Sequence, residues 1–411
     1  MLTRLILALV LLVPQAYIFL RFRRWVNTRN RKLQRLRAPV YLLFALSNLL
    51  MIGVIATQPR PTNLSAWAIY SLVYPFLLWH SATFIIALVL LSAAIVKLPF
   101  ALAWKGLLAL RVTRPTIQSI REHPRAQAFD ASRRVFLRRG VYGLTAASFG
   151  GTAYGMLIGR NACDMNEREI LIKGLPQELS GLAIGLVTDV HSSLYMQKRD
   201  MDEYVRRMND FGVDIVIVAG DLVNGNVNEV HPFAEAFSRL KAPMGVYGVL
   251  GNHDFYTQQP DKIARVAMEA GVRILRDESL VLKRNGSLIR IAGVDDAGTN
   301  QLAAQKMDVA LKQEENRLPT VLVCHRPYFL EEAADRNVGL VLSGHTHGGQ
   351  VVFGRMGGTT MTPAALYSPY VWGLYRKEQT QMYVSRGIGT VGVPIRINCP
   401  PELTRIVLRP A

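Results

Sequence analysis

The sequence contains little cysteine. Only Cys163, Cys324 and Cys399 occur in 411 residues, and no two cysteines stand in a Cys-x-x-Cys spacing. Three cysteines do not make a disulfide framework, and without a Cys-x-x-Cys pair the usual zinc-finger and thioredoxin-like motifs are excluded. The stability of the chain must come from packing instead, and its length is sufficient for two or three units with cores of their own.

Acidic residues are almost missing from the first 160 residues. This part holds 21 Lys and Arg but only two Asp and Glu, whereas residues 161–411 hold 27 basic and 28 acidic residues. The formal net charge of +18 therefore comes from the N-terminal part alone. Because that part is also the hydrophobic one, its charge indicates membrane topology and anionic lipid headgroups, and we expect no nucleic-acid partner.

Long hydrophobic segments are plentiful in the N-terminal part. Residues 5–20, 39–57 and 67–96 are strongly apolar and near or above the roughly 20 residues that a membrane-spanning helix needs. They have no polar face, which argues against helices buried in a soluble core. A fourth segment, residues 140–159, is rich in small residues and less hydrophobic. We therefore expect a transmembrane region of about four helices in residues 1–160.

The loops between these segments predict their orientation. Residues 21–37 carry eight Lys and Arg and no acidic residue, and residues 97–139 are also basic. Basic loops remain in the cytoplasm, so two crossings must separate them, and residues 67–96 must form one long helix. Residues 98–110 are then expected to be an interfacial amphipathic piece and not a further span.

A motif before the fourth segment bears on export. Residues 132–138, Ser-Arg-Arg-Val-Phe-Leu-Arg, resemble a twin-arginine signal. The alternative is a basic flank that holds the helix end inside. In both cases the chain crosses outward after Gly140. The sequence thus predicts a multi-pass protein of a bacterial cytoplasmic (inner) membrane, with a linker at residues 161–180 and a second domain at residues 181–411 on the extracytoplasmic side.

Short apolar runs ending in polar turns begin near Leu182. They are rich in Val, Ile and Leu, which is typical of buried strands. The runs cover residues 182–188, 214–219, 245–250, 320–324 and 338–342. Helical patterns at residues 200–211 and 260–270 lie between them, so we expect an α/β unit. Ligands of such sheets bind at the carboxyl ends of the strands.

A polar cluster follows each of these runs. Five of the eight histidines lie in the clusters, most of them beside Asp, Asn or another His. The clusters are Asp189-Val190-His191, Gly220-Asp221, Gly251-Asn252-His253-Asp254, His325 and Gly344-His345-Thr346-His347. Oxygen and imidazole donors without thiolates suit Mn, Fe or Zn. Two such ions can lower the pKa of a water that bridges them, which yields hydroxide for attack on phosphorus.

The order of these motifs strongly resembles that of the calcineurin-like metallophosphoesterase family. The resemblance covers about residues 180–411. The stretch Ser-Gly-His-Thr-His-Gly-Gly-Gln at residues 343–350 and the tail at residues 385–396 are similar to the bacterial YkuE-like branch, whose members are often membrane-bound or exported. The resemblance implies a two-sheet β-sandwich flanked by helices and a metal-dependent phosphoric ester hydrolase.

The resemblance also implies a role for each motif residue. The implied metal ligands are, for one ion, Asp189, His191 and His347, for the other ion, Asn252, His325 and His345, and, bridging both ions, Asp221. His253 would face the substrate, where it would stabilise the transition state or protonate the leaving oxygen, and Asp254 would orient it. No expected ligand is missing, so we expect an active enzyme for phosphodiesters or phosphomonoesters.

Neither the fold nor the metal motifs identify the substrate. The aromatic residues Tyr367, Tyr370, Trp372 and Tyr375 either pack under a long loop or form a wall that faces a lipid or a sugar beside the site. An anchored domain is expected to act on a phosphorylated small molecule or lipid, such as a phospholipid, a lipid-linked pyrophosphate or a cell-wall phosphodiester.

Three alternatives stay open at this point. Some relatives in the wider family cleave the pyrophosphate of lipid A precursors, which would favour a cytoplasmic active site. The helices could instead be the main actor, as a transporter or sensor, but in the first three segments only His80 is readily ionisable. A metal-dependent binding domain without turnover is the third alternative, and the presence of His253 with Asp254 argues against it.

Overall fold

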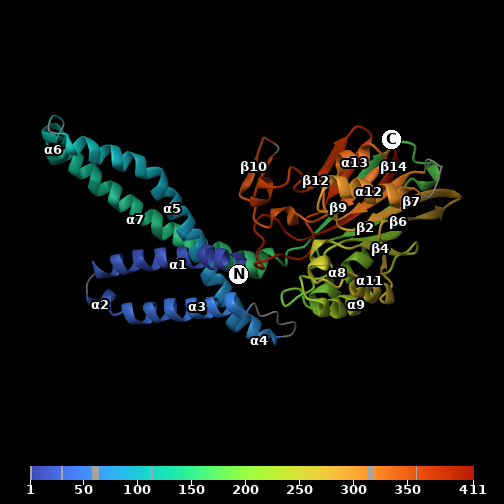
Figure 1. Ribbon diagram of the computed structural model, residues 1–411, viewed down its shortest axis with the longest axis horizontal. Coiled ribbons are helices and arrows are strands. Elements are labelled where there is room, and N and C mark those ends of the chain that lie inside the picture. Colours follow the sequence, from blue (N-terminus) through green and yellow to red (C-terminus); the bar gives the residue numbers. More distant parts are fainter. Residues whose placement is uncertain are drawn as a thin grey trace. The chain divides into compact units, whose positions relative to one another are not determined.

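The computed structural model describes residues 2–28, 31–57, 64–110, 112, 114–312, 318–357 and 359–411. Within the predicted basic loops, residues 29–30, 111 and 113 lie outside this part. The chain forms two compact units, a helical unit of residues 1–60 and 65–153 and an α/β unit whose main part is residues 154–411. Figure 1 shows the elements of both units.

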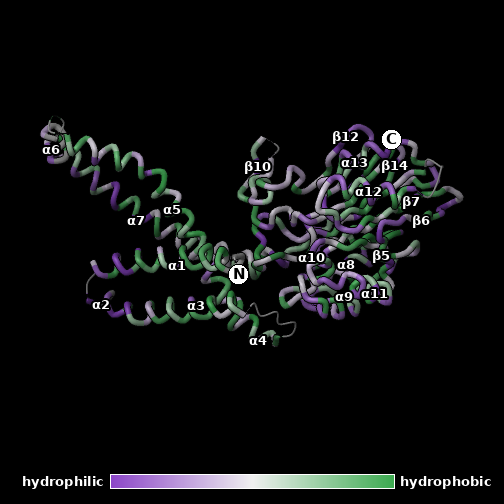
Figure 2. The backbone as a smooth tube through the Cα atoms, viewed as in Figure 1, coloured by the Kyte–Doolittle hydropathy of each residue, from purple (hydrophilic) through white to green (hydrophobic). Residues whose placement is uncertain are grey.

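Apolar helices make up the helical unit. Its elements are α1 (Leu2–Asn27), α2 (Arg31–Gln34), α3 (Arg37–Thr57), α4 (Ala66–Ala68), the π-helical turn η1 (Ile69–Val73), α5 (Tyr74–Ala109), α6 (Arg114–Glu122) and α7 (Pro124–Tyr154). Phe44 on α3 packs edge-to-face against Phe19 of α1 at 5.4 Å and Trp79 of α5 at 5.1 Å. Figure 2 shows α3 and α5 as mostly hydrophobic.

Two helical segments are long and apolar enough to cross a membrane, Arg37–Thr57 and Ala66–Ala109. Their large apolar side chains are mostly exposed, such as Leu49 at 64% and Ile95 at 69%. The core helix of a soluble protein would bury such side chains, whereas a membrane helix exposes them to lipid. These two segments support membrane association, and the four-span arrangement stays a prediction.

The long helix α5 does not end where the sequence predicted. It continues through Pro99 to Ala109 without a break. The separate interfacial piece expected over residues 98–110 is therefore the end of the same helix. Proline at this position does not stop the helix, because the residues on both sides of it favour helix strongly.

Two six-stranded mixed sheets form the centre of the α/β unit. Their strand orders are β1-β14-β2-β3-β4-β5 and β12-β13-β9-β8-β7-β6. Strands β2 to β5 run parallel in the first sheet, and β7, β8, β9 and β13 run parallel in the second. The strands are β1 (Asp164–Ile172), β2 (Ala183–Val187), β3 (Ile215–Ala219), β4 (Val246–Val249), β5 (Arg273–Ile274), β6 (Glu278–Arg284), β7 (Ser287–Val294), β8 (Thr320–Cys324), β9 (Leu340–Ser343), β12 (Gly373–Lys377), β13 (Thr380–Val384) and β14 (Glu402–Pro410), with a separate hairpin of β10 (Gly354–Met356) and β11 (Thr359–Met361).

Strand residues alternate between two hydrophobic cores. On β3, Ile215 and Ile217 lie in the core between the two sheets, whereas Val216 and Val218 lie in the core under the outer helices of the first sheet. The layers are therefore helix, sheet, sheet and helix, which confirms the predicted two-sheet sandwich flanked by helices (Figure 1). The helices are, on the first sheet, α8 (Lys198–Asp210), α9 (Val230–Phe237) and α11 (Pro260–Glu269), on the second sheet, α12 (Asn300–Leu311) and α13 (Leu330–Ala334), and, after β4, α10 (Asn252–Tyr256).

Residues 161–180 are not a linker, contrary to the prediction. Strand β1 lies in this range and pairs in parallel with β14 along its full length, from Asp164 opposite Glu402 to Ile172 opposite Pro410. In β1 only Ile170 and Ile172 are buried. Its other residues are mostly polar and exposed, as is typical of an edge strand. For this reason the sequence of β1 resembles that of a linker.

Candidate metal centre

The predicted site residues all follow strands at one edge of the two sheets. Because neighbouring strands run parallel, their carboxyl ends meet there, as the sequence predicted. The residues follow, in order, β2 (Asp189 and His191), β3 (Asp221), β4 (Asn252, His253 and Asp254), β8 (His325) and β9 (His345 and His347).

Asp189, His191 and His347 form one group of potential ligands. Nε2 of His347 is 3.3 Å from Oδ1 of Asp189 and 3.0 Å from Nε2 of His191. Three donor atoms this close to one another, on side chains that are almost fully buried, can contact a single cation.

Asp221 connects this group to a second one. Its Oδ2 is 3.5 Å from Nε2 of His191 and 3.1 Å from Nε2 of His325. Asp221, His325 and His345 offer ligand atoms within 4.8 Å of one another, and so do His191, Asp221 and His253. Asp221 therefore lies where a carboxylate shared by two cations would lie.

The two buried carboxylates need a positive partner. Asp189 and Asp221 are 0% and 1% exposed, and within the described residues neither forms an ion pair with lysine or arginine. An uncompensated buried carboxylate is costly, so a cation is the expected partner. One neighbouring buried atom, Oδ1 of Asn252, has no hydrogen-bond partner in the same part of the chain. The oxygen and nitrogen donors of the site fit divalent Mn, Fe or Zn.

Five site residues have left-handed backbone conformations. The φ angles are +51° at Asp189, +48° at His191, +54° at Asp221, +72° at His345 and +53° at His347. Residues other than glycine rarely adopt this region, and each such residue costs of order 1–3 kcal/mol. Strain of this kind concentrates at functional sites, and no pattern in the sequence predicted it.

Glycine lets two turns approach the carboxylates of Asp221 and Asp189 closely. A Cβ atom on Gly251 would overlap Oδ1 of Asp221, and a Cβ atom on Gly344 would overlap Oδ2 of Asp189. The glycines before Asn252 and His345 in the sequence motifs are therefore required by packing against the site.

His253 is held by a different partner from the one the sequence predicted. Its Nδ1–H donates to the carbonyl oxygen of Asn224 at 2.8 Å. The carboxylate of Asp254 instead accepts backbone N–H groups of Leu222, Val223 and Gly251 at 2.8–3.1 Å. Asp254 therefore fastens the turn after β4 to the turn after β3, and it orients His253 only through the backbone.

Burial keeps three of the imidazoles neutral. It lowers the pKa of His191 and of His345 to about 3, and it lowers the pKa of His347 well below the usual value. Neutral imidazole is the form that binds a metal. Burial also opposes charge on Asp221 and His325, but the attraction between these two outweighs it, so the pKa of Asp221 is lowered and that of His325 is raised to about 10.

A buried arginine under the site was not predicted to have a structural role. Arg396 is 0% exposed, and its guanidinium donates to the carbonyl oxygens of Arg386 at 2.8 Å, Gly387 at 3.1 Å and Cys399 at 3.1 Å. A longer contact of 3.4 Å reaches the carbonyl oxygen of His347. Arg396 thus holds the loop after β13 against the turn that carries His347.

The aromatic stretch after the site is partly structural. The phenol oxygen of Tyr375 accepts the backbone N–H of Val371 at 2.9 Å, and Tyr370 and Tyr375 pack against the outer core of the second sheet. Trp372 lies under the guanidinium of Arg355 at 4.0 Å. Of the four aromatics that the sequence indicated, only Tyr367 is largely exposed, at 61%.

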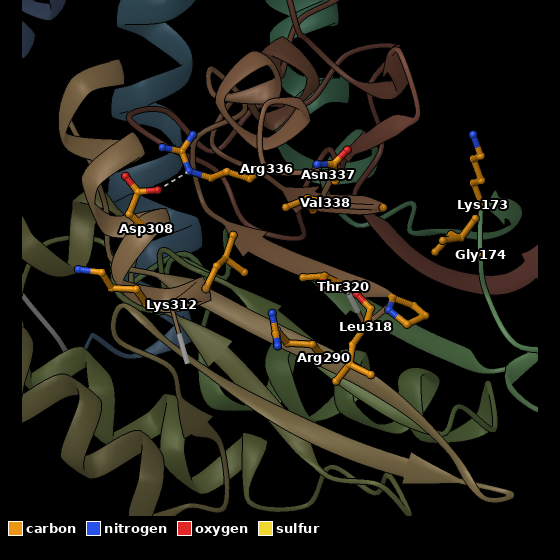
Figure 3. Close-up of a pocket in the computed structure, with 14 residues that line it drawn as sticks. Lys173, Gly174, Arg290, Asp308, Lys312, Leu318, Thr320, Arg336, Asn337 and Val338 are labelled. Carbon is orange, nitrogen blue, oxygen red and sulfur yellow. Dashed lines mark hydrogen bonds and ion pairs between the residues drawn. The ribbon is translucent and has the colours of Figure 1, made fainter. Parts of the chain in front are cut away.

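A separate cavity of about 760 Å³ lies in the α/β unit. It is lined from the amino-terminal ends of β8 and β9, at the opposite ends of the strands that lead to the metal centre. Figure 3 shows Lys173, Arg290 and Lys312 around it, together with the ion pair of Arg336 and Asp308 at 2.9 Å. It contains none of the candidate ligands.

Comparisons with known proteins agree with this geometry. The family model "Calcineurin-like phosphoesterase" matches residues 182–349, which include every candidate ligand from Asp189 to His347. An uncharacterized metallophosphoesterase of Helicobacter pylori is 33% identical over 280 residues, covering 67% of this chain and 71% of that protein. The uncharacterized metallophosphoesterase YkuE of Bacillus subtilis is 29% identical over 285 residues, covering 68% of this chain and 98% of that protein.

A vertebrate relative is also similar. It is a "Transmembrane protein with metallophosphoesterase domain" of Danio rerio, 31% identical over 268 residues, which are 63% of this chain. The match spans 60% of that relative and 56% of the Bos taurus protein of the same name. The similarity to these two proteins thus covers little more than half of their length.

Proposed function

The chain belongs to the calcineurin-like metallophosphoesterase family, and from this membership we propose that it is a membrane-anchored phosphoesterase that uses two divalent cations. The observation that carries the proposal is a pair of ligand groups, one of Asp189, His191 and His347 and one of Asp221, His325 and His345, with Asp221 also 3.5 Å from His191 of the first group. Both groups lie at the carboxyl ends of parallel strands, where α/β proteins bind their ligands.

The proposed ligands divide between two sites. They are, for one cation, Asp189, His191 and His347, for the other cation, Asn252, His325 and His345, and, between them, Asp221. Mn, Fe or Zn would suit these donors. When bound, two such cations would activate a water molecule and neutralise charge on the phosphate oxygens. The chain itself would hold the seven ligand side chains at a fixed spacing in a buried site.

His253 is the proposed acid of the reaction. It would protonate the leaving oxygen or stabilise the charge that develops there. Because its Nδ1–H donates to Asn224, Nε2 is the nitrogen that is available to a substrate. The backbone N–H of His253 donates to Oδ1 of Asp221 at 2.9 Å, which couples its position to the shared carboxylate.

The helical unit is the proposed anchor in a bacterial cytoplasmic membrane. Support comes from the segments Arg37–Thr57 and Ala66–Ala109 and from the printed names of the fish and cattle relatives as transmembrane proteins. The basic loops place the α/β unit on the extracytoplasmic side in this proposal, whether or not the twin-arginine-like motif is used. A phosphodiester or phosphomonoester of a lipid or of the cell wall is the proposed substrate.

The test is hydrolysis of bis(p-nitrophenyl) phosphate and p-nitrophenyl phosphate by the full chain in detergent micelles. It would be run with Mn²⁺, with Zn²⁺ or with a chelator. We expect metal-dependent turnover that Asp221→Ala abolishes and that Asp210→Ala, at an exposed position on α8, leaves intact. Failure of the folded chain to hydrolyse either ester with any metal would overturn the proposal.

A further inference from the structure

Large apolar side chains are exposed on the segment that follows His347. Monomeric soluble domains seldom expose several of them together. Five residues, here called the apolar patch, have these exposed fractions: Phe353 73%, Met356 73%, Met361 46%, Leu366 90% and Tyr367 61%. Three of them lie on or beside the hairpin β10–β11, which projects from the body of the α/β unit (Figure 1).

The apolar patch is connected directly to the metal centre. The short helix η6 (Pro363–Leu366), which ends in Leu366, packs against η5 (His347–Gly349), which begins with a candidate ligand. The hydroxyl of Thr362 donates to the carbonyl oxygen of Gly349 at 3.2 Å and fastens these two turns together. The end of the patch at Leu366 therefore lies near the turn that carries His347.

The sequence that carries the apolar patch is basic. Residues 348–377 contain Arg355, Arg376 and Lys377 but no Asp or Glu, although residues 161–411 as a whole carry slightly more acidic than basic residues. Lys377 pairs with Glu331 at 3.4 Å, so Arg355 and Arg376 carry the positive excess. Apolar side chains mixed with cations and aromatic residues suit the interface of an anionic bilayer. A protein partner would not require this absence of acidic residues.

We propose that the apolar patch contacts the lipid phase and holds the hydrocarbon chain of a phosphorylated lipid while its phosphate reaches the metal centre. The proposal rests on the proposed function and narrows its substrate class to membrane lipids. The helices of Arg37–Thr57 and Ala66–Ala109 keep the α/β unit at a bilayer, so the patch needs to supply only the local contact. Hydrolysis breaks the phosphorus–oxygen bond to the leaving group, and water supplies the new oxygen and the proton.

The experiment compares two diesters with the same leaving group, methyl p-nitrophenyl phosphate and hexadecyl p-nitrophenyl phosphate. The full chain in detergent micelles would be assayed as wild type and as Phe353→Ser/Met356→Ser. The control is Met268→Ser/Val281→Ser, which removes apolar side chains of 48% and 37% exposure from elsewhere in the same unit. The quantity measured is the ratio of kcat/KM for the hexadecyl ester to that for the methyl ester.

We expect the wild type and the control to favour the hexadecyl ester, and the patch variant to lower the ratio roughly tenfold through lost apolar contact. An equal loss on both esters would overturn the proposal, because it would indicate a structural role. A ratio that the patch variant leaves unchanged would overturn it as well. Absence of hydrolysis of either ester would instead count against the proposed function itself.

A contact measurement separates the two proposals. Met356→Cys, in a chain with Cys163→Ser, would carry an environment-sensitive dye, since Cys324 and Cys399 are buried. In nanodiscs that contain phosphatidylglycerol, acyl-chain-brominated lipids should quench this dye, and they should not quench a dye at Val281→Cys. Equal quenching at the two positions would overturn the proposed lipid contact, even for a chain that hydrolyses both esters.

Discussion

The two units of the chain differ in the hydrogen bonds that their polar side chains form. In the helical unit, side chains bond mainly to their own helix: Thr83 donates to Trp79 O at 2.6 Å, and Asn48 donates to Phe44 O at 2.7 Å. One long-range bond joins two helices, from Gln15 to Thr83 at 2.5 Å. No Asp, Glu, Lys or Arg is buried among the described residues of this unit.

In the α/β unit, buried polar groups bond across large distances in the sequence. The backbone N–H of His345 donates to Asp189 across 156 residues, and that of His253 donates to Asp221 across 32 residues. Two of these residues, Asp189 and Asp221, are acidic and have left-handed conformations. The difference indicates which unit carries the chemistry. Hydrogen bonds within one helix stabilise a scaffold, whereas hydrogen bonds that bring distant, strained polar residues together form a site.

The largest effect should follow from removing the buried arginine. Arg396→Met leaves several buried carbonyl groups without a donor, so the free energy of unfolding of the α/β unit should fall by about 3–5 kcal/mol. Urea denaturation followed by fluorescence measures this change. Arg409→Met, which removes a surface ion pair with Glu169, should cost less than about 1 kcal/mol. Similar losses for both variants would remove the contrast between buried, convergent hydrogen bonds and an exposed ion pair.

Crowding the shared carboxylate should abolish function before it abolishes the fold. In Gly251→Ala the new Cβ overlaps Asp221 and the ring of His325, so metal-dependent hydrolysis should fall by at least about a hundredfold. Steady-state kinetics at saturating Mn²⁺ measures the loss. Gly298→Ala has open space around its Cβ and is the matched control. Wild-type activity in Gly251→Ala would contradict the assigned geometry.

Removing metal should affect one unit and spare the other. Chelator should lower the free energy of unfolding of the α/β unit by about 3 kcal/mol relative to a metal concentration of a hundred times Kd. The far-ultraviolet circular dichroism signal of the helical unit should not change with chelator, because its described residues contain no cluster of three potential metal ligands. Chelator-insensitive unfolding of the α/β unit would argue against bound cations.

Without metal, the α/β unit should lose stability as pH rises. Burial alone would lower the pKa of His325, but Asp221 raises it to about 10, against 6.5 for an ordinary histidine. This contribution is complete below pH 6.5 and disappears as pH rises toward about 10, with a slope of at most about 1.4 kcal/mol per pH unit. Urea denaturation in chelator at pH 7, 8 and 9 measures the slope. Asp221→Asn should flatten it, and an unchanged slope in that variant would assign it to another group.

The smallest effect is expected in the helical unit. Gln15→Leu removes the bond to Thr83, but Thr83 keeps its bond to Trp79, so the loss should be about 0.6 kcal/mol. Thermal unfolding in detergent, compared with Asn48→Leu, measures it. A loss above about 2 kcal/mol would show that long-range polar bonds support this unit as well.

Local patterns predicted the elements near the site. The run that became β3 ends one residue before Gly220-Asp221, and the run that became β8 ends directly before His325. A buried strand followed by a polar turn needs only neighbouring residues to be recognised, and parallel strands bring such turns together. This is why the polar clusters could be located before the fold was known, whereas the ligand role of each residue was implied by the resemblance to the family.

Features that depend on distant partners could not be predicted. Strand β1 exists because of β14, and the orientation of His253 depends on the carbonyl group of Asn224. The role of Arg396 depends on which carbonyl groups the loop of residues 385–399 turns inward. The left-handed conformation of Asp189 is imposed by its surroundings and opposes the intrinsic preference of the residue.

The position of β14 has a consequence for biosynthesis. This strand lies between β1 and β2 in the first sheet, although it follows all the other strands of the two sheets in the sequence. Strand β1 cannot join the sheet, and the core around Ile170 and Leu408 cannot close, until residue 410 has been translated. A growing chain therefore keeps this edge unpaired until β14 has emerged from the ribosome, and the emergence of β14, not that of β1, completes the sheet.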